Sequence, residues 1–410
     1  MKGRTLPAVA ALALVSLFPS DVSAATCAQA GTDTTVAEDP ADPFIDFIVG
    51  VEETIYEGDP TFLDDAMDVG MLIEIASEGL DVPDEMKRGI REGMGGNFQI
   101  GESIIQSNEE ADGTYTFLRM MPGAPGHALF RFAGDDGLEY HELVLALNDD
   151  GEVRVADLVT YTMGDSVSSI LRRAMLALMA DSERGFLDKV LGRGDSEYVE
   201  SLVKLKRFTD LADVDPEAAR KIYAEFPDSV KQLPEIQRLH VQCAAAIGDE
   251  AYQSALEEFE RWLPDSPALP LVVMDLYIMN EDFSAAQGCL DRIDKAVHGD
   301  PYLDIMRSQL HQADGEFEVA LQCLDRAVER EEGLDMPAAW ERLEIALSTD
   351  DFPEIRKQLQ WLYRRSDYAF GDVSGEEAFA AFNASKAGER WAKFIARRES
   401  GAGDDDSDDD

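Results

Sequence analysis

The chain has 410 residues, which is long enough for two or three domains. Apolar residues make up 45% of it, so most of the chain can bury a core as globular proteins do. The 83 acidic and 36 basic residues give a net charge of −47, a field that repels nucleic acid and anionic membrane surfaces and argues against both as partners.

The first residues have the pattern of an export signal. Lys2 and Arg4 precede an apolar run at 6–18, and the small residues Val22-Ser23-Ala24 follow it. The run is too short for a retained membrane helix, so we expect residues 1–24 to be a cleaved secretory signal peptide. The predicted protein is therefore exported, either to a periplasm or out of the cell, with no membrane insertion.

The next two segments differ in composition and periodicity. Residues 25–41 are small and polar without any period, which predicts a disordered linker. Residues 42–165 predict an α+β domain, because helical spacing up to Gly93 gives way to a period of two, with Asp-Asp-Gly turn sequences between the alternating runs. The expected strands form an antiparallel four-stranded meander at 115–121, 127–132, 138–147 and 152–161.

This element order is similar to the nuclear-transport-factor-2-like (SnoaL-like) family, with the helices broken at 56–65 (YEGDPTFLDD). Cystatin-like and other α+β sheets are alternatives. The resemblance implies a cone-shaped domain with a ligand pocket, for which His127, His141 and Asp157 are the candidate side chains. The alternative interpretation is that the histidines are half-packed at strand ends and that Asp157 is an edge charge that discourages sheet pairing.

A repeated pattern begins later in the chain. Phe317, Ala320 and Leu324 form one helical stripe, in which the small residue allows close approach of a neighbouring helix. The same aromatic–small–large pattern recurs about every 34 residues, a period typical of stacked helix pairs. Its other copies are Tyr252, Ala255 and Phe259; Phe283, Ala286 and Leu290; and Phe352, Ile355 and Leu359.

This pattern resembles the second-helix part of the tetratricopeptide repeat (TPR) motif. The resemblance implies an all-α helical-repeat solenoid at 236–370. We expect connecting helices and a degenerate first repeat at 166–235 and capping helices at 371–398. Residues 399–410 end in a run of aspartates, which predicts an acidic disordered tail.

The three cysteines in this region are predicted to be free and buried. Cys289 and Cys323 occupy the same phase of neighbouring repeats, where helices lie roughly 8–10 Å apart, too far for a disulfide. Cys243 is expected to behave in the same way, as a small hydrophobe. Cys27 lies in the linker, and the sequence leaves open whether it is modified.

In the TPR family the first helix of each unit lines a concave groove. The family's chaperone-binding branch holds a peptide carboxylate there with lysine and asparagine, but this chain has His240 and Ala244, so that clamp is absent. A mixed apolar and acidic groove instead suits a partner with basic and apolar side chains. The alternative is that these residues pack within the superhelix. The residues carried over to the groove are His240, Asp275, Tyr302, Ile305, Gln309, Trp340 and Glu344.

The sequence lacks the common catalytic and phosphate-binding motifs, such as Gly-x-x-x-x-Gly-Lys, His-Glu-x-x-His and Gly-x-Ser-x-Gly. We therefore expect no enzyme activity, no cofactor and no metal site. The first functional hypothesis is an extracytoplasmic scaffold that binds a protein or peptide, possibly basic, in the repeat groove. The alternative is a small-molecule-binding or weakly catalytic α+β domain, with the repeats serving assembly.

Overall fold

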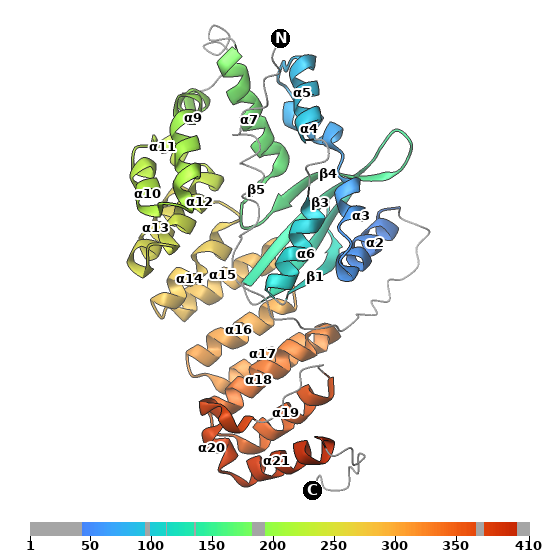
Figure 1. Cartoon of the computed structure of the whole chain (residues 1–410), viewed down its shortest axis with the longest axis vertical. Helices are drawn as coiled ribbons and strands as arrows, with labels where there is room; N and C mark the ends of the chain where they lie inside the picture. Colours follow the sequence, from blue (N-terminus) through green and yellow to red (C-terminus); the bar gives the residue numbers. More distant parts are fainter. Residues whose placement is uncertain are drawn as a thin grey trace. The chain divides into compact units, whose positions relative to one another are not determined.

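The structure, a computed structural model, is mostly helical with one small antiparallel sheet (Figure 1). It describes residues 43–94, 99–111, 113–134, 137–182, 193–365 and 373–399. The predicted signal peptide and linker, Cys27 and residues 400–410 of the predicted tail lie outside these ranges. The described chain divides into a first unit, residues 43–280 with 296–298, and a second unit, residues 281–295 with 299–399.

Five helices open the first unit, and local sequence signals explain where they begin. The Asp68 side chain accepts a hydrogen bond of 2.9 Å from the backbone N–H of Met71, which caps the third of them. A Cβ added at Gly101 would come within 2.6 Å of the Pro60 carbonyl oxygen. The helix that contains Gly101 therefore packs closely on the backbone at Pro60, between the first two helices. The helices are α2 (Pro43–Glu57), α3 (Thr61–Ala66), α4 (Val69–Ser77), α5 (Asp84–Met94) and α6 (Ile100–Glu110).

The sheet is antiparallel, and its strands are paired in chain order. The four predicted strands are confirmed, but the expected four-stranded meander is wrong by one strand. The fifth strand pairs Asp165 and Ser166 with β4 and contains only these two residues, too few to produce an alternating pattern. The strands are β1 (Thr114–Met120), β2 (His127–Gly134), β3 (Gly137–Leu147), β4 (Val153–Thr160) and β5 (Asp165–Ser166).

The main core of the first unit lies between one face of this sheet and its helices. Phe130, Leu143 and Leu158 from neighbouring strands are fully buried against Ile48 of α2 and Leu72 of α4. Helix α7 (Val167–Ser182) follows β5 and packs on β4 and α4. Burial on this scale, at about 25 cal/mol per Å² of apolar surface, is what holds the helices to the sheet.

The rest of the first unit is helical. Successive helices pack on one another, α9 with α10, α12 with α13, and α13 with α14. A second core forms here around Phe208 and Tyr223. The helices are α9 (Arg193–Ala212), α10 (Pro216–Ala224), α11 (Asp228–Lys231), α12 (Pro234–Ala245), α13 (Asp249–Trp262) and α14 (Leu269–Met279).

The second unit is a helical C-terminal region. Helix α16 packs on α17, and α18 packs on α19. Three short 3₁₀ segments lie at Glu332–Leu334, Val373–Gly375 and Glu377–Phe379. Its helices are α15 (Phe283–Ala296), α16 (Tyr302–Ala313), α17 (Phe317–Arg330), α18 (Asp335–Ser348), α19 (Phe352–Arg365), α20 (Ala380–Asn383) and α21 (Lys386–Glu399).

Two features recur through α12–α19. The small residues Ala255, Ala286 and Ala320 are each fully buried, as the sequence pattern predicted. The turns before α13, α15, α17 and α19 each contain a residue with positive φ, and these residues are 33, 34 and 35 apart along the chain: Gly248, Glu281, Gly315 and Asp350. The prediction for the cysteines is also confirmed, since Cys243, Cys289 and Cys323 are buried and free.

Candidate functional site

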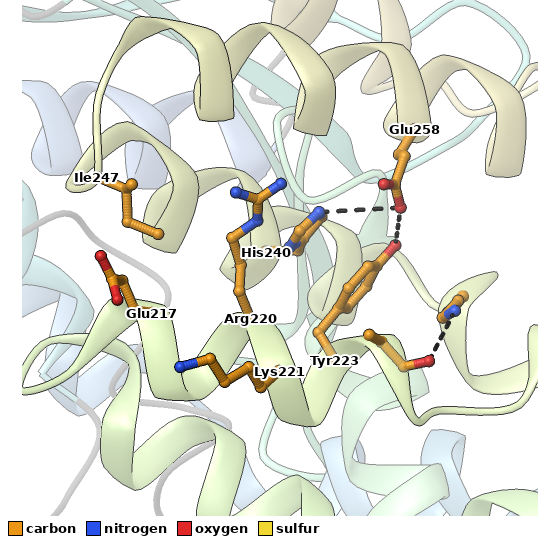
Figure 2. A pocket seen from close by; sticks show the side chains of 9 residues that line it. Glu217, Arg220, Lys221, Tyr223, His240, Ile247 and Glu258 are labelled. Atoms are coloured by element: carbon orange, nitrogen blue, oxygen red, sulfur yellow. Dashed lines mark hydrogen bonds and ion pairs between the residues drawn. The ribbon is translucent and has the colours of Figure 1, made fainter.

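An open pocket of about 500 Å³ lies among α10, α11, α12 and α13 of the first unit (Figure 2). We call it the His240 pocket. Three cationic side chains and two carboxylates line it, together with an aromatic pair and an exposed isoleucine. The lining residues are Glu217, Arg220, Lys221, Tyr223, Ala224, Lys231, His240, Ile247 and Glu258.

Helix α10 supplies much of the charge in this pocket. Its start is fixed by Asp215, whose side chain accepts a hydrogen bond of 3.0 Å from the N–H of Ala218, and by Pro216 in the first turn. Residues spaced three and four apart share one helical face, which here carries Arg220 and Lys221 together with Glu217. The opposite face of α10 is buried in the core, so these charged side chains point away from it.

His240 is the buried centre of the pocket. Its side chain is only 1% exposed, and its ring stacks on Tyr223 with the centroids 3.6 Å apart and the planes 5° from parallel. Neither ring nitrogen has a hydrogen-bond partner among the described residues. The nearest acidic oxygen, on Glu258, is 3.9 Å from Nε2, which is too long for a hydrogen bond.

The tyrosine beneath this ring is held by three neighbours. Its hydroxyl donates to Glu258 at 3.0 Å and accepts a hydrogen bond of 2.8 Å from the amide of Gln237. The ammonium of Lys231 lies 5.3 Å from the ring centroid, within the range of a cation–π contact. Tyr223 is therefore a fixed platform for the imidazole of His240.

Electrostatics make His240 neutral at physiological pH. Burial lowers its pKa to about 3, and repulsion from Arg220 and Lys231 adds to this effect. A neutral imidazole has one N–H donor and one acceptor nitrogen. The pocket therefore contains a neutral, unsatisfied donor–acceptor ring with the cations Arg220 and Lys231 near it.

A different surface lies on α16 and α18 of the second unit, and we call it the Trp340 face, defined by Gln309, Trp340, Glu341 and Glu344. The side-chain amide of Gln309 donates to Oε1 of Glu341 at 2.7 Å. The other carboxylate oxygen of Glu341, Oε2, is buried and has no hydrogen-bond partner among the described residues. Burial raises the pKa of Glu341 to about 7; repulsion from Glu344 adds to the rise and the Gln309 hydrogen bond partly offsets it.

Trp340 stays 36% exposed beside this carboxylate. It lies four residues before Glu344, so the two share one face of α18. Glu341 and Glu344 are three apart and also neighbour one another. An exposed indole and two carboxylates, one of them with a buried oxygen, thus lie within about one turn of α18.

The other predicted groove residues are distributed differently. Ile305 is 2% exposed and belongs to the core formed by α16, α17 and α18, and Tyr302 packs half-buried on the same core. Asp275 accepts a hydrogen bond of 2.8 Å from the hydroxyl of Tyr252. His240 and Asp275 belong to the first unit, whereas the other five predicted groove residues belong to the second.

The structure does not bring the three sheet candidates together. In the β2–β3 register His127 pairs with Val144 and Phe130 with His141, so the two histidines lie on opposite faces of the sheet. Nδ1 of His127 lies 2.5 Å from a carboxylate oxygen of Glu142.

The surroundings of the remaining two sheet candidates are those of packed residues. His141 is buried beside Tyr115, with ring centroids 5.7 Å apart, and burial lowers its pKa to about 4. Asp157 accepts hydrogen bonds from the backbone N–H of Ser168, at 3.0 Å, and from its hydroxyl, at the start of α7. Its carboxylate therefore fastens α7 to β4.

Sequence reasoning missed most of the His240 pocket. In the sequence, Arg220 and Lys221 look like ordinary polar residues of an amphipathic helix, and Tyr223 has the spacing of a core aromatic residue. The charged pair next to a tyrosine was the only local signal. The stacking partner of Tyr223 lies seventeen residues later, which no local pattern predicts.

No group of His, Cys, Asp and Glu suited to holding a metal ion occurs in the part of the chain that the structure describes. Among the same residues, no helix combines the length and apolar character needed to cross a bilayer. Comparison of the chain with protein-family models, with curated proteins and with solved structures gave no match in any of the three.

Proposed function

We propose that the protein is an exported, non-enzymatic scaffold that binds a protein or peptide partner through a TPR-like helical-repeat region. The repeat architecture is supported by the regular spacing of the positive-φ turns and by the buried alanines at equivalent helix positions. A residue with left-handed φ lets one helix end and an antiparallel partner begin, and a small residue lets the two helices approach closely.

The observation that carries this proposal is the buried Oε2 of Glu341, which lacks a hydrogen-bond partner among the described residues, one position after exposed Trp340 on α18. Buried polar atoms are normally hydrogen-bonded, because leaving one without a partner costs about 1–3 kcal/mol. A lysine or arginine of a partner would pair with this oxygen once the Glu341 side chain turned toward it, and an apolar side chain would cover the indole. Desolvated tryptophans are frequent centres of binding energy in protein interfaces.

The partner is therefore expected to carry basic and apolar side chains. The net charge of −47 attracts basic proteins at long range and speeds their encounter, an effect that salt screens over about 8 Å at physiological ionic strength. The short-range contacts at the Trp340 face would supply most of the affinity, and the overall charge would affect mainly the association rate.

The small-molecule-binding α+β domain has less support. A ligand pocket needs several polar groups that converge in one cavity. His127 and His141 lie on opposite faces of the sheet, and the carboxylate of Asp157 is bound to Ser168. The helical region is therefore the better candidate for the functional part of the chain.

A titration of the full chain with a short lysine–leucine peptide tests this proposal. The Trp340 indole signal, assigned in a ¹⁵N-tryptophan-labelled sample, should shift on binding. Trp340→Ala should weaken binding at least tenfold, since truncating a central tryptophan commonly costs more than about 1.4 kcal/mol.

Leu321→Ala is the matched control, because Leu321 is equally exposed, at 36%, on neighbouring α17. This variant should bind the peptide as the original chain does. Equal binding by the Trp340→Ala and Leu321→Ala variants would refute the assignment of the partner site to the Trp340 face.

A further inference from the structure

The His240 pocket differs from the rest of this strongly acidic chain. Arg220, Lys221 and Lys231 line it against Glu217 and Glu258, so the local balance of charge is positive. No sequence motif identified in the chain accounts for this clustering, and the proposed peptide site lies in the other unit. The pocket therefore requires its own explanation.

We propose that the His240 pocket binds a small oxyanion ligand through a phosphate or carboxylate group, independently of the proposed peptide site. Arg220 and Lys221 would hold the charged oxygens, and the His240 ring would donate its N–H to the same group. The guanidinium fork suits both phosphate and carboxylate oxygens, and an ammonium group adds a compact point charge.

Two cations are available for such a ligand. Arg220 and Lys221 make no hydrogen bond or ion pair with the residues that the structure describes, although Glu217 lies on the same helical face. Figure 2 shows both cations on one side of the imidazole, while Glu258 lies on the other side with the hydroxyl of Tyr223. An anion bound on the Arg220 side would therefore avoid the Glu258 carboxylate.

His240 provides the second, independent reason. A ring that is 99% buried with both nitrogens unsatisfied is unusual, because interiors satisfy their polar atoms. The stacked Tyr223 ring fixes the plane of the His240 imidazole, so the two ring nitrogens can point only within that plane. Figure 2 shows the guanidinium of Arg220 on the side of the imidazole away from Glu258, so an anion held by Arg220 would approach the ring from that side.

An anion would also change the protonation of the ring. In the free pocket burial and the two cations Arg220 and Lys231 lower the pKa of His240 to about 3. A bound anion offsets the repulsion from these cations, and Glu258 at 3.9 Å and the hydroxyl of Tyr223 complete the groups that face the ring. The pKa of His240 should therefore rise when the ligand binds.

The test uses the full chain with histidine labelled by ¹⁵N, at constant ionic strength set with sodium chloride. Inorganic phosphate and citrate are the two probes, the first for a phosphate group and the second for carboxylates. The ring nitrogens of His240 should shift with at least one probe, and the probe that binds more tightly identifies the ligand group.

Arg220→Gln should weaken binding of that probe about tenfold, the effect of losing a hydrogen bond to a charged group. Lys206→Gln is the matched control, because it removes one positive charge from an exposed position on α9, where Lys206 pairs with Asp210 at 3.0 Å. This control should change the affinity less than twofold.

The proposal is overturned if neither probe shifts the His240 ring nitrogens, or if the Arg220→Gln and Lys206→Gln variants bind alike. The second outcome would mean that the anion responds only to overall charge. Folding of the Arg220→Gln variant is checked by the urea midpoint of the first unit, which contains Arg220. Peptide binding at the Trp340 face should be the same in both variants.

Discussion

The His240 pocket and the Trp340 face are built on similar helix pairs but present opposite chemistry. The pocket places a buried neutral histidine in a lining with three cations, whereas the face combines a carboxylate of raised pKa with an exposed indole. In each, a buried polar atom lacks a hydrogen-bond partner within the described residues. Similar helix packing therefore supports two different arrangements of charged side chains in this chain.

The comparison also separates the field of the whole protein from the local one. A net charge of −47 predicts attraction of cations everywhere on the surface. The lining of the pocket on α10–α13 has more positive than negative side chains. A ligand bound there interacts mainly with these nearby charges, because salt screens the distant ones. Net charge therefore indicates which partners approach quickly, but not which ligands each site selects.

The largest expected effect comes from placing a larger side chain at a buried alanine where two helices pack closely. Such an alanine occurs in each unit. Ala255→Leu in the first unit and Ala320→Leu in the second should each destabilise the unit that carries the change by about 1–3 kcal/mol, because both alanines are fully buried. Hydrogen exchange resolved along the chain measures the effect in each unit. Loss of protection in both units from either single change would show that they do not respond separately.

Acid should next distinguish the two sites. The folded pKa of His240 is about 3, below its usual value of 6.5, so the neutral buried ring contributes stability that is lost as pH falls from 6.5 toward 3. At pH 5 the loss should approach about 2 kcal/mol in the first unit.

Urea unfolding at pH 7 and pH 5, in the original chain and in a His240→Phe variant, measures this loss. His141 loses stability over the same range because its pKa is also lowered, so the variant isolates the part due to His240. An equal pH effect in both proteins would contradict the assigned burial of a neutral His240.

The Trp340 face should also weaken in acid, but its pH dependence should appear in peptide affinity around neutral pH rather than in the stability of the first unit. Burial raises the pKa of Glu341 to about 7, and a lysine of the peptide favours the charged carboxylate. Affinity for the lysine–leucine peptide should therefore increase as pH rises from 6 to 8, by up to about tenfold per pH unit below the pKa. Calorimetric titrations of the original chain and of a Glu341→Gln variant provide the measurement, and the variant should bind independently of pH over this range.

The smallest expected effect concerns the turns. Glu281 has a φ of 56°, a left-handed conformation that Gly315 adopts at the equivalent turn with a φ of 78°. Glu281→Gly should stabilise the second unit by about 0.5–1 kcal/mol, and Gly315→Ala should destabilise it by a similar amount. Urea midpoints of the two variants test this, and the same sign for both changes would contradict the equivalence of the turns.

Local patterns in the sequence predicted a large part of the fold. The four longer strands follow from alternation and turn chemistry, as at Gly151, whose positive φ of 78° closes the β3–β4 turn. The buried alanines of α13, α15 and α17 follow from their helical spacing. These features depend on neighbours within a few residues, which is why one sequence suffices to predict them.

The sites depend on longer-range packing, and the sequence predicted them less well. Ile305 and Trp340 were both expected in the groove, but Ile305 is buried in the core while Trp340 is half-exposed. Helical periodicity identifies an apolar stripe but not the neighbouring helix that covers it. The stacking of Tyr223 on His240 and the raised pKa of Glu341 likewise depend on contacts between different helices.

Reversal of charge at the Trp340 face is the most direct test of the proposed partner site. A chain carrying both E341K and E344K should lose affinity for the lysine–leucine peptide and gain it for a glutamate–leucine peptide of equal length, because the contacting charges have changed sign while Trp340 remains. Calorimetric titration of each chain with each peptide gives the four affinities. A switch in preference is the predicted result, and unchanged preference for the lysine–leucine peptide would show that the partner site lies elsewhere.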